Sequence, residues 1–225
     1  MPRDKRLIPP DGYLHIMCRG NNKQFIFHSP LDYRNYYELL FEMREENKIE
    51  INHYCLMNNH IHLIVHVKSK SDLARYMKQV NLTYFHYYRR RYGYAGHIWQ
   101  GRFKSNIIEK GSYLIQCGKY IELNPVKAGI VEHPREYKYS SYQHYAYGKK
   151  DKLIKEDPEY LQTGRSQNQI RKAYRDFVID ETIKEFIDVK KYLGTDRFVK
   201  KMERYFSIKN SNKKRGWPKG KKRTI

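Results

Sequence analysis

The chain has 225 residues, with 45 lysines and arginines against 24 acidic residues, so its formal net charge at pH 7 is +21. A hydrophobic content of 40% can supply a folded core, which excludes a simple disordered chain. The longest aliphatic run, Leu63 to Val65, is far short of the roughly 18 apolar residues of a membrane span. We therefore expect a soluble protein with a polyanionic partner. Nucleic acid fits the interleaved basic and aromatic residues better than a membrane surface does.

Apolar periodicity and turn-forming residues predict most elements of the first 150 residues. In chain order we expect a strand at 13–19, a helix from 30 to about 48, strands at 49–57 and 60–67, a helix at 72–92, a strand at 102–109 and a helix from 112 to about 124. Asn58 and Asn59 tolerate positive φ and suit a tight hairpin turn. The last helix must end near Asn124, because Pro125 disfavours helical geometry in the residue before it. This pattern predicts an α+β fold, an antiparallel sheet with helices packed on one face.

The composition changes near residue 150, where the chain becomes charged and poor in strand formers. We expect helices at 167–179 and 195–206. The predicted organisation is a first domain at 1–150, a small helical module at 151–208 and a disordered basic tail at 209–225. The tail holds eight basic residues and no acid, so removing it leaves +13 on the rest. The tail therefore does not explain the charge by itself.

Two pairs of polar residues could carry chemistry. In the strand His60 to Val67, the two-residue period places His60 and His62 side by side on the face opposite the aliphatic residues, near enough to share one divalent ion. Two histidines on an exposed or helix-covered sheet face would give the same pattern. In the helix from Ser112, Tyr120 and Asn124 are four residues apart and share a face. An ordinary core-edge tyrosine and a helix-terminal asparagine would also look like this.

No acidic residue occurs between Asp72 and Glu109. Basic residues there alternate with aromatic ones, and the basic residues that we expect to bind DNA are Arg75, Lys78, Arg89, Arg90, Arg91, Arg102 and Lys104. Cationic groups bind the phosphate backbone while aromatic faces stack on unpaired bases, which favours single-stranded or hairpin DNA over a uniform duplex. A solvated helix face above core aromatics is the ordinary alternative.

Four blocks of the sequence resemble those of one protein family. Leu56 to His62 resembles the HUH signature (His, hydrophobic, His) of single-tyrosine nucleases, in the form that it takes in REP-associated tyrosine transposases. The blocks 19–22, 99–105 and 120–129 agree with the same family and occur in its order, over about Tyr13 to Tyr142. Asn58 is commonly Pro in these proteins, a difference that concerns only the turn.

The resemblance implies a ferredoxin-like or RRM-like HUH fold and a set of site residues. Tyr120 would be the nucleophile, His60 and His62 would bind a divalent metal, and Asn124 would be the third protein ligand. The family implies Mg²⁺ or Mn²⁺, although imidazole ligands would equally suit Zn²⁺. Cleavage of single-stranded or hairpin DNA would leave a 5′-phosphotyrosine. Three cysteines without close pairing make a reducing cytoplasm the expected location, and we expect a bacterial protein associated with the nucleoid. The sequence leaves open whether it is a monomer or a homodimer.

Two other functions remain open from the sequence. The protein could be a non-catalytic regulator that binds DNA hairpins, although intact His60, His62, Tyr120 and Asn124 argue against this. It could also be a metal hydrolase that uses His60, His62 and His66 as ligands and water as the nucleophile. That hydrolase would form no covalent adduct with DNA and would not need Tyr120. Otherwise we expect His66 to be structural.

Overall fold

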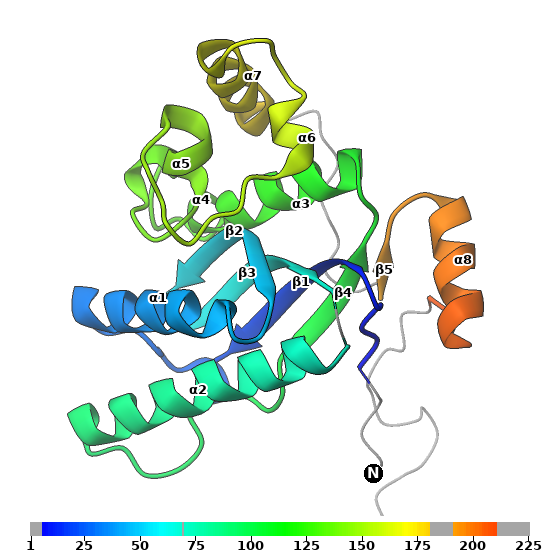
Figure 1. Cartoon of the computed structure of the whole chain (residues 1–225). Helices are drawn as coiled ribbons and strands as arrows, with labels where there is room; N and C mark the ends of the chain where they lie inside the picture. The colour runs from blue at the N-terminus through cyan, green and yellow to red at the C-terminus, as the bar shows by residue number, and fades with distance from the viewer. Residues whose placement is uncertain (1–5, 69, 181–190, 211–225) are drawn as a thin grey trace, which may run out of the picture.

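The computed structural model describes residues 6–68, 70–180 and 191–210 (Figure 1). The elements in chain order are β1 (Gly12–Arg19), η1 (Asn21–Lys23), α1 (Pro30–Arg44), β2 (Ile49–Met57), β3 (His60–Val67), α2 (Lys70–Tyr92), β4 (Lys104–Ile108), α3 (Ser112–Glu122), α4 (Asn124–Lys127), η2 (Pro134–Glu136), α5 (Tyr142–Tyr147), α6 (Pro158–Leu161), α7 (Gln167–Ile179), β5 (Tyr192–Leu193) and α8 (Asp196–Phe206). None of the described helices combines the length and apolar character that crossing a membrane requires.

One five-stranded sheet organises the described chain, with the strand order β2-β3-β1-β4-β5. Neighbouring strands are antiparallel except β4 and β5, which run parallel. The hairpin of β2 and β3 pairs Met57 with His60 across the two-asparagine turn. The predicted α+β class and the predicted hairpin are therefore confirmed, but neither Asn58 nor Asn59 adopts a positive φ.

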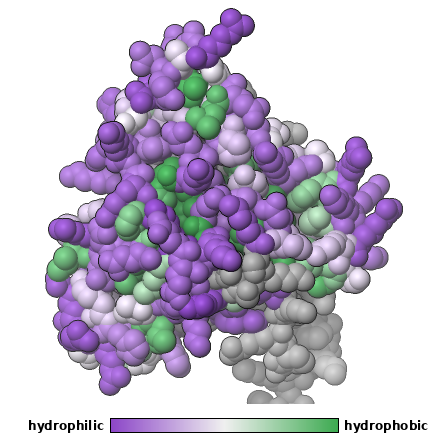
Figure 2. Space-filling view, viewed as in Figure 1, coloured by the Kyte–Doolittle hydropathy of each residue, from purple (hydrophilic) through white to green (hydrophobic). Residues whose placement is uncertain are grey.

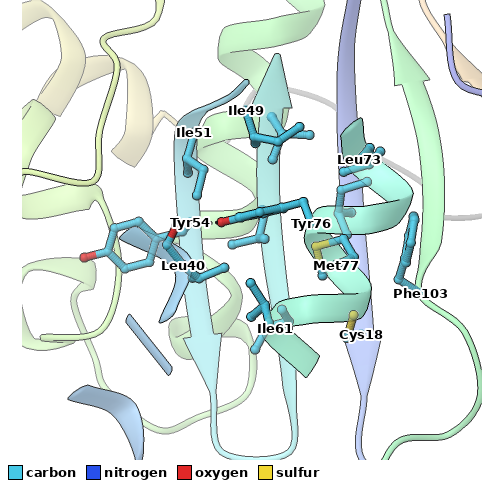
Figure 3. Close-up of a cluster of buried hydrophobic side chains, with 14 of the residues drawn as sticks. Cys18, Leu40, Ile49, Ile51, Tyr54, Ile61, Leu73, Tyr76, Met77 and Phe103 are labelled. Carbon is cyan, nitrogen blue, oxygen red and sulfur yellow. Dashed lines mark hydrogen bonds between the residues drawn. The ribbon is translucent and has the colours of Figure 1, made fainter. Parts of the chain in front are cut away.

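The main core lies between the sheet and the helices α1 and α2. The face of β3 that carries Ile61, Leu63, Val65 and Val67 is fully buried there. Figure 3 shows Tyr76 and Met77 of α2 lying over these strands, and the Tyr76 hydroxyl donates to the Leu40 carbonyl oxygen at 2.9 Å. The predicted apolar faces of α2 and β3 are confirmed, because both elements present these residues to the same core layer.

A second layer covers the other face of the sheet, which corrects the expectation that helices pack on one face. Leu114, Cys117 and Ile121 of α3 are buried against Cys55 and Ile64 of the sheet. Figure 1 shows α3 on the side of the sheet opposite α1 and α2. The second face includes apolar side chains as well as histidines, and their burial requires a helix there.

Several boundaries differ from the predicted ones by a few residues. Helix α1 ends at Arg44 rather than near 48, because the following turn reaches a positive φ of 55° at Lys48. Asn47 closes that turn by donating to the Met43 carbonyl oxygen at 2.8 Å. As Pro125 predicted, α3 ends before it, and Asn124 begins the short helix α4.

Residues after 150 pack against the first part of the chain. The Lys155 amide donates to the Ile51 carbonyl oxygen at 2.8 Å, so this segment shields part of the β2 edge. Leu153, Tyr192 and Met202 join the main core. The predicted helices 167–179 and 195–206 correspond to α7 and α8. The boundary near 150 stays a prediction, and most of the predicted basic tail, 211–225, lies outside the described residues.

Candidate active site

The two histidines of the predicted metal pair begin strand β3 and face α3. Their ring centroids are 4.9 Å apart, and His62 is only 2% exposed while His60 is partly exposed. Burial, helped by the charge of Arg19, lowers the pKa of His60 to about 4. Burial also lowers the pKa of His62 well below its usual range. Both imidazoles are therefore neutral at pH 7, the form in which histidine binds metal ions.

Each of these rings has one nitrogen engaged in a hydrogen bond. Nδ1 of His60 lies 2.6 Å from Oδ1 of Asn59, and Nδ1 of His62 lies 2.8 Å from Nε2 of His15. Metal-binding histidines are commonly oriented through a hydrogen bond at the second nitrogen. The pair leaves two Nε2 atoms as ligand atoms, so these residues fit a divalent ion.

Tyr120 lies beside the histidines, as the resemblance implied. Its ring centroid is 6.2 Å from that of His62 and 6.2 Å from that of His15, with the rings nearly perpendicular in both pairs. Tyr120 is partly exposed, while Cys117 and Ile121 anchor the helix beneath it. The packing of α3 on the sheet therefore holds a partly accessible phenol next to two neutral imidazoles.

Asn124 joins the site through the end of helix α3. Its side-chain amide donates to the carbonyl oxygens of Tyr120 at 3.0 Å and Ile121 at 3.2 Å. These bonds use the NH₂ group, and the amide oxygen remains as a possible ligand atom. Asn124 is thus held one helical turn from Tyr120, as the spacing of four residues predicted.

Two residues of this site were not singled out in the sequence. His15 of β1 stacks on His62 with ring centroids 5.0 Å apart, and burial lowers the pKa of His15 to about 4. Lys127 of α4 places its Nζ 5.0 Å from the centroid of the Tyr120 ring. The two-residue period of β1 places His15 on the face opposite the aliphatic residues of the strand, but the sequence does not show that β1 pairs with β3. Lys127 lies inside the block 120–129 that resembles the transposases.

A buried cluster of charged groups anchors the end of α3. His53 of β2 bonds Glu122 at 3.0 Å and Asp157 at 3.2 Å, and all three side chains are fully buried. Ser141 and Tyr174 donate their hydroxyls to Glu122 at 2.5 Å and 2.8 Å. Glu122 lies between Tyr120 and Asn124 in the sequence. The cluster therefore ties the helix that carries the phenol to the sheet and to residues after 150.

Three of the transposase-like blocks meet at the hairpin end of the sheet. The Gly20 amide donates to the Asn59 carbonyl oxygen at 2.8 Å, and the Gln100 amide donates to the Arg19 carbonyl oxygen at 2.8 Å. A Cβ at Gly20 would lie 2.2 Å from the Gln24 carbonyl oxygen, so this close approach requires glycine. Residues far apart in the sequence thus frame His60.

The predicted DNA-binding residues are all exposed, but they do not gather around Tyr120. Arg75, Lys78 and Arg89–Arg91 belong to α2, on the sheet face opposite α3 (Figure 1). Arg75 forms an ion pair with Glu46, and Nε of Arg91 lies 3.5 Å from Oδ1 of Asp32. Arg102 and Lys104 lie before and at the start of β4. The structure thus places the α2 residues on the face opposite the histidine pair, whereas Lys104 pairs with Met17, the strand neighbour of His62, and shares the sheet face of the histidines.

His66 does not join the other two histidines. It bonds Glu50 at 2.9 Å and Asp11 at 2.6 Å. Four residues of strand place it roughly 13 Å from His62 along β3. Within the described ranges, no group of three or more His, Cys, Asp or Glu side chains is arranged to hold a metal ion. The ligand set of the hydrolase alternative is therefore not assembled.

The fold and this arrangement of histidines and tyrosine agree with the class of tyrosine transposases. Residues 10–124 match the family described as "Transposase IS200 like", and the chain belongs to this family. It is 28% identical over 141 residues to a Haemophilus influenzae protein named as a REP-associated tyrosine transposase, covering 58% of this chain and 78% of that protein. A solved structure of a REP-associated tyrosine transposase bound to a REP hairpin superposes with a TM-score of 0.56 at 19% identity, covering 70% of this chain and 93% of the other. These matches confirm the resemblance.

Proposed function

We propose that this transposase cleaves and rejoins single-stranded or hairpin DNA, with Tyr120 as the nucleophile and a 5′-phosphotyrosine intermediate. The observation that carries the proposal is the Tyr120 ring beside His62, with His60 adjacent and Asn124 bonded to the Tyr120 backbone. Phenol has a pKa near 10 and is a weak nucleophile at neutral pH, so its environment must assist it.

His60, His62 and Asn124 would hold a divalent ion, Mg²⁺ or Mn²⁺ as in the family. Bound there, the ion would polarise a phosphate oxygen of the DNA. All three ligands are neutral, so they leave the positive charge of the ion uncompensated. His15 would orient His62 through their hydrogen bond, and Asn59 would do the same for His60.

The proposed reaction exchanges one phosphodiester for another. The Tyr120 oxygen attacks phosphorus and loses its proton, the bond to the 3′ oxygen breaks, and that oxygen leaves as a protonated 3′ hydroxyl. The 5′ phosphate stays on Tyr120. Attack by a 3′ hydroxyl on the phosphotyrosine reverses these steps, so rejoining needs no ATP.

The basic residues of α2 would contribute to DNA affinity from the other side of the sheet, and Arg102 and Lys104 would contribute from the start of β4. Their exposure supports this role, since phosphate contacts supply most non-specific affinity. The proposed location is a bacterial cytoplasm, where the protein would associate with the nucleoid by binding DNA. The bacterial relative supports this location. Either a monomer or a homodimer is compatible with the proposal.

A covalent adduct tests the proposed chemistry. Labelled single-stranded hairpin oligonucleotides are incubated with the protein and Mn²⁺, and the products are separated under denaturing conditions. A protein–DNA band that survives denaturation is expected. Binding without any adduct or cleavage would instead favour a hairpin-binding regulator, and cleavage without an adduct would favour the hydrolase.

A further inference from the structure

A hollow of about 290 Å³ lies at the outer edge of β2, between α1 and the segment 138–151. We call it the β2-edge hollow. Its aromatic wall consists of Tyr33, Tyr37, Tyr54 and Tyr139. Exposed basic residues stand around it, namely Arg34, Lys138, Lys149 and Lys150. This is a different surface from the basic face of α2.

The tyrosines of the hollow are held in place by one another and by one carboxylate. The Tyr33 and Tyr139 rings stack with centroids 3.7 Å apart and planes 5° from parallel. The hydroxyls of Tyr37 and Tyr54 donate to Asp151 at 2.6 Å and 2.8 Å. Asp151 is the one acidic residue among the described residues that line the hollow, and its oxygens are already hydrogen-bonded. The wall is thus preorganised.

The cations of the hollow keep their charges available. Among the described residues, Arg34, Lys138, Lys149 and Lys150 form no ion pair with a carboxylate, in contrast to Arg75 on α2. Lys149 makes only a neutral contact from its ammonium, to the Gln143 side chain at 3.2 Å. Four positive charges therefore surround four aromatic rings, against the single carboxylate of Asp151.

A second hollow, of about 440 Å³, lies farther along β2 and also has basic residues around it. Its basic lining residues are Arg44, Lys48, Lys68, Lys152 and Lys155, and the carboxylates of Glu45 and Glu50 line it as well. The segment 149–155 contributes to both hollows. Some of these charges are paired, with Lys68 3.0 Å from Glu50 and Lys152 3.0 Å from Glu38. The basic residues along β2 are therefore least often paired with carboxylates at the β2-edge hollow. Figure 2 shows hydrophilic residues over most of the visible face of the molecule.

The β2-edge hollow adjoins the strands that carry the active site. Tyr139 packs against the main core and also against the cluster that includes Tyr120. The Tyr139 carbonyl oxygen accepts a hydrogen bond from the Leu56 amide at 2.9 Å, and Leu56 pairs with Ile61 of β3. Ile61 lies between His60 and His62. A strand of DNA at the active site could therefore pass around this edge of the sheet.

We propose that the β2-edge hollow binds a single-stranded segment of the DNA substrate next to the cleaved phosphodiester. Phosphates would contact the four cations, and an unpaired base would pack against the tyrosine wall, the combination by which proteins hold single strands. This inference rests on the proposed function and adds a binding subsite to it.

The test compares two triple variants that lose the same charge, both in a Tyr120→Phe background so that cleavage does not interfere. One carries Lys138→Gln, Lys149→Gln and Lys150→Gln. The matched control carries Lys172→Gln, Lys200→Gln and Lys201→Gln, exposed positions of α7 and α8 that do not line the hollow. Fluorescence anisotropy measures binding of a labelled hairpin with and without a single-stranded extension across a salt series. Thermal unfolding checks that each variant folds.

The hollow variant is expected to lose roughly a hundredfold in affinity for the extended hairpin at about 0.1 M salt. Its log-log salt slope should fall by about 2, since each lost single-strand phosphate contact removes roughly 0.7. The control and the blunt hairpin should change little. Tyr139→Leu should weaken binding of the extension without changing the slope.

Three outcomes would overturn the inference. An equal loss of salt slope in the control variant would show that only the overall charge of the protein matters. An equal loss of affinity for the blunt hairpin would show that the single-stranded extension does not occupy the hollow. An unchanged slope in the hollow variant would show no contact there. If the unsubstituted protein bound neither probe, the proposed function itself would fail together with the subsite.

Discussion

The imidazole of His53 on β2 lies 3.0 Å from the carboxylate of Glu122, the last residue of α3. Asp157 bonds the other side of the same ring, and all three side chains are shielded from solvent. A neutral imidazole carries one N–H, so the ring can donate to both carboxylates only when it is protonated. The helix that carries Tyr120 is therefore attached to the sheet through an ion pair.

This ion pair makes stability depend on pH. Burial by itself lowers the pKa of His53, but hydrogen bonds to Asp157 and Glu122 and their charges raise it to about 9, above the ordinary 6.5. His53 therefore adds stability that is fully present below about pH 6.5 and is lost as the pH rises through about 9. We expect the free energy of unfolding in urea to fall between pH 7 and 9.5.

His53→Gln is the comparison for this pH effect. Loss of one partner of a buried ion pair should cost about 3–5 kcal/mol at pH 7. The remaining stability should vary less between pH 7 and 9.5 than that of the unsubstituted protein. Tyrosines of the unfolded chain, with a pKa near 10, begin to ionise below pH 9.5, but both proteins share this contribution and the comparison removes it. Parallel pH curves for the two proteins would refute the assigned charge state.

Tyr120→Phe should remove cleavage and the covalent adduct while leaving DNA binding nearly intact, because only the hydroxyl is lost and the ring still packs. Tyr113→Phe is the matched control, since Tyr113 contacts the same cluster from the same helix. Denaturing gels report the adduct and anisotropy reports binding. Cleavage at the unsubstituted rate by Tyr120→Phe would disprove the assignment of the nucleophile.

The proposed metal ligands predict a graded series of effects on cleavage. His60→Ala or His62→Ala should abolish cleavage at saturating DNA, whereas Asn124→Ala should weaken it and be partly rescued by excess Mn²⁺. His66→Ala should matter less, because its ring is committed to Glu50 and Asp11. Metal titrations of the cleavage rate provide the measurement. The ligand set would be wrong if His66 proved essential and Asn124 silent.

Much of the sheet could be predicted because its signals are local. Alternating residues around Asn58 and Asn59 define the hairpin, and Pro125 ends α3 through a clash with its own neighbour. The second helical layer was not predicted, although Cys55 and Ile64 are apolar and need cover. Periodicity shows that a face is apolar, and it does not show which distant helix will cover that face.

In the candidate site too, residues in short local motifs could be predicted, and contacts between distant parts of the sequence could not. His60, His62, Tyr120 and Asn124 lie in short motifs, so their pairing could be inferred from spacing and resemblance. His15 is part of the site only because β1 pairs with β3, and its ring reaches His62 across 47 positions of sequence. The contact of His53 with Asp157 spans 104 positions. Such contacts depend on the tertiary fold.

Lys127 should contribute to cleavage through its charge. Its ammonium lies 5.0 Å from the Tyr120 ring centroid, where it can stabilise negative charge on the phenol oxygen or the attacked phosphate. Lys127→Gln is expected to slow cleavage at saturating DNA by roughly tenfold, the effect of about 1.4 kcal/mol in the barrier. Lys127→Arg should keep most of the rate. Equal rates for the Gln variant and the unsubstituted protein would exclude this role.

Gly118 of α3, the helix that carries Tyr120, lies directly against His53 of the sheet. A Cβ there would lie 2.6 Å from the His53 ring, which cannot move away because Glu122 and Asp157 hold both of its nitrogens. Gly118→Ala should therefore push α3 outward and destabilise the fold by about 1–3 kcal/mol, the usual range for overpacking. Tyr120 would move with the helix.

The matched control for this substitution is Gly111→Ala, because a Cβ at Gly111 would have no heavy atom within 4 Å other than those of its chain neighbours. That position has a φ of 102°, so its cost is backbone strain without a clash against His53. Urea unfolding measures the stability of each variant. The cleavage rate at saturating DNA reports whether Tyr120 is displaced. We expect Gly118→Ala to lower the rate more than Gly111→Ala at matched stability, reached by adjusting temperature. Rates that simply follow stability in both variants would show that the contact of α3 with His53 does not position Tyr120.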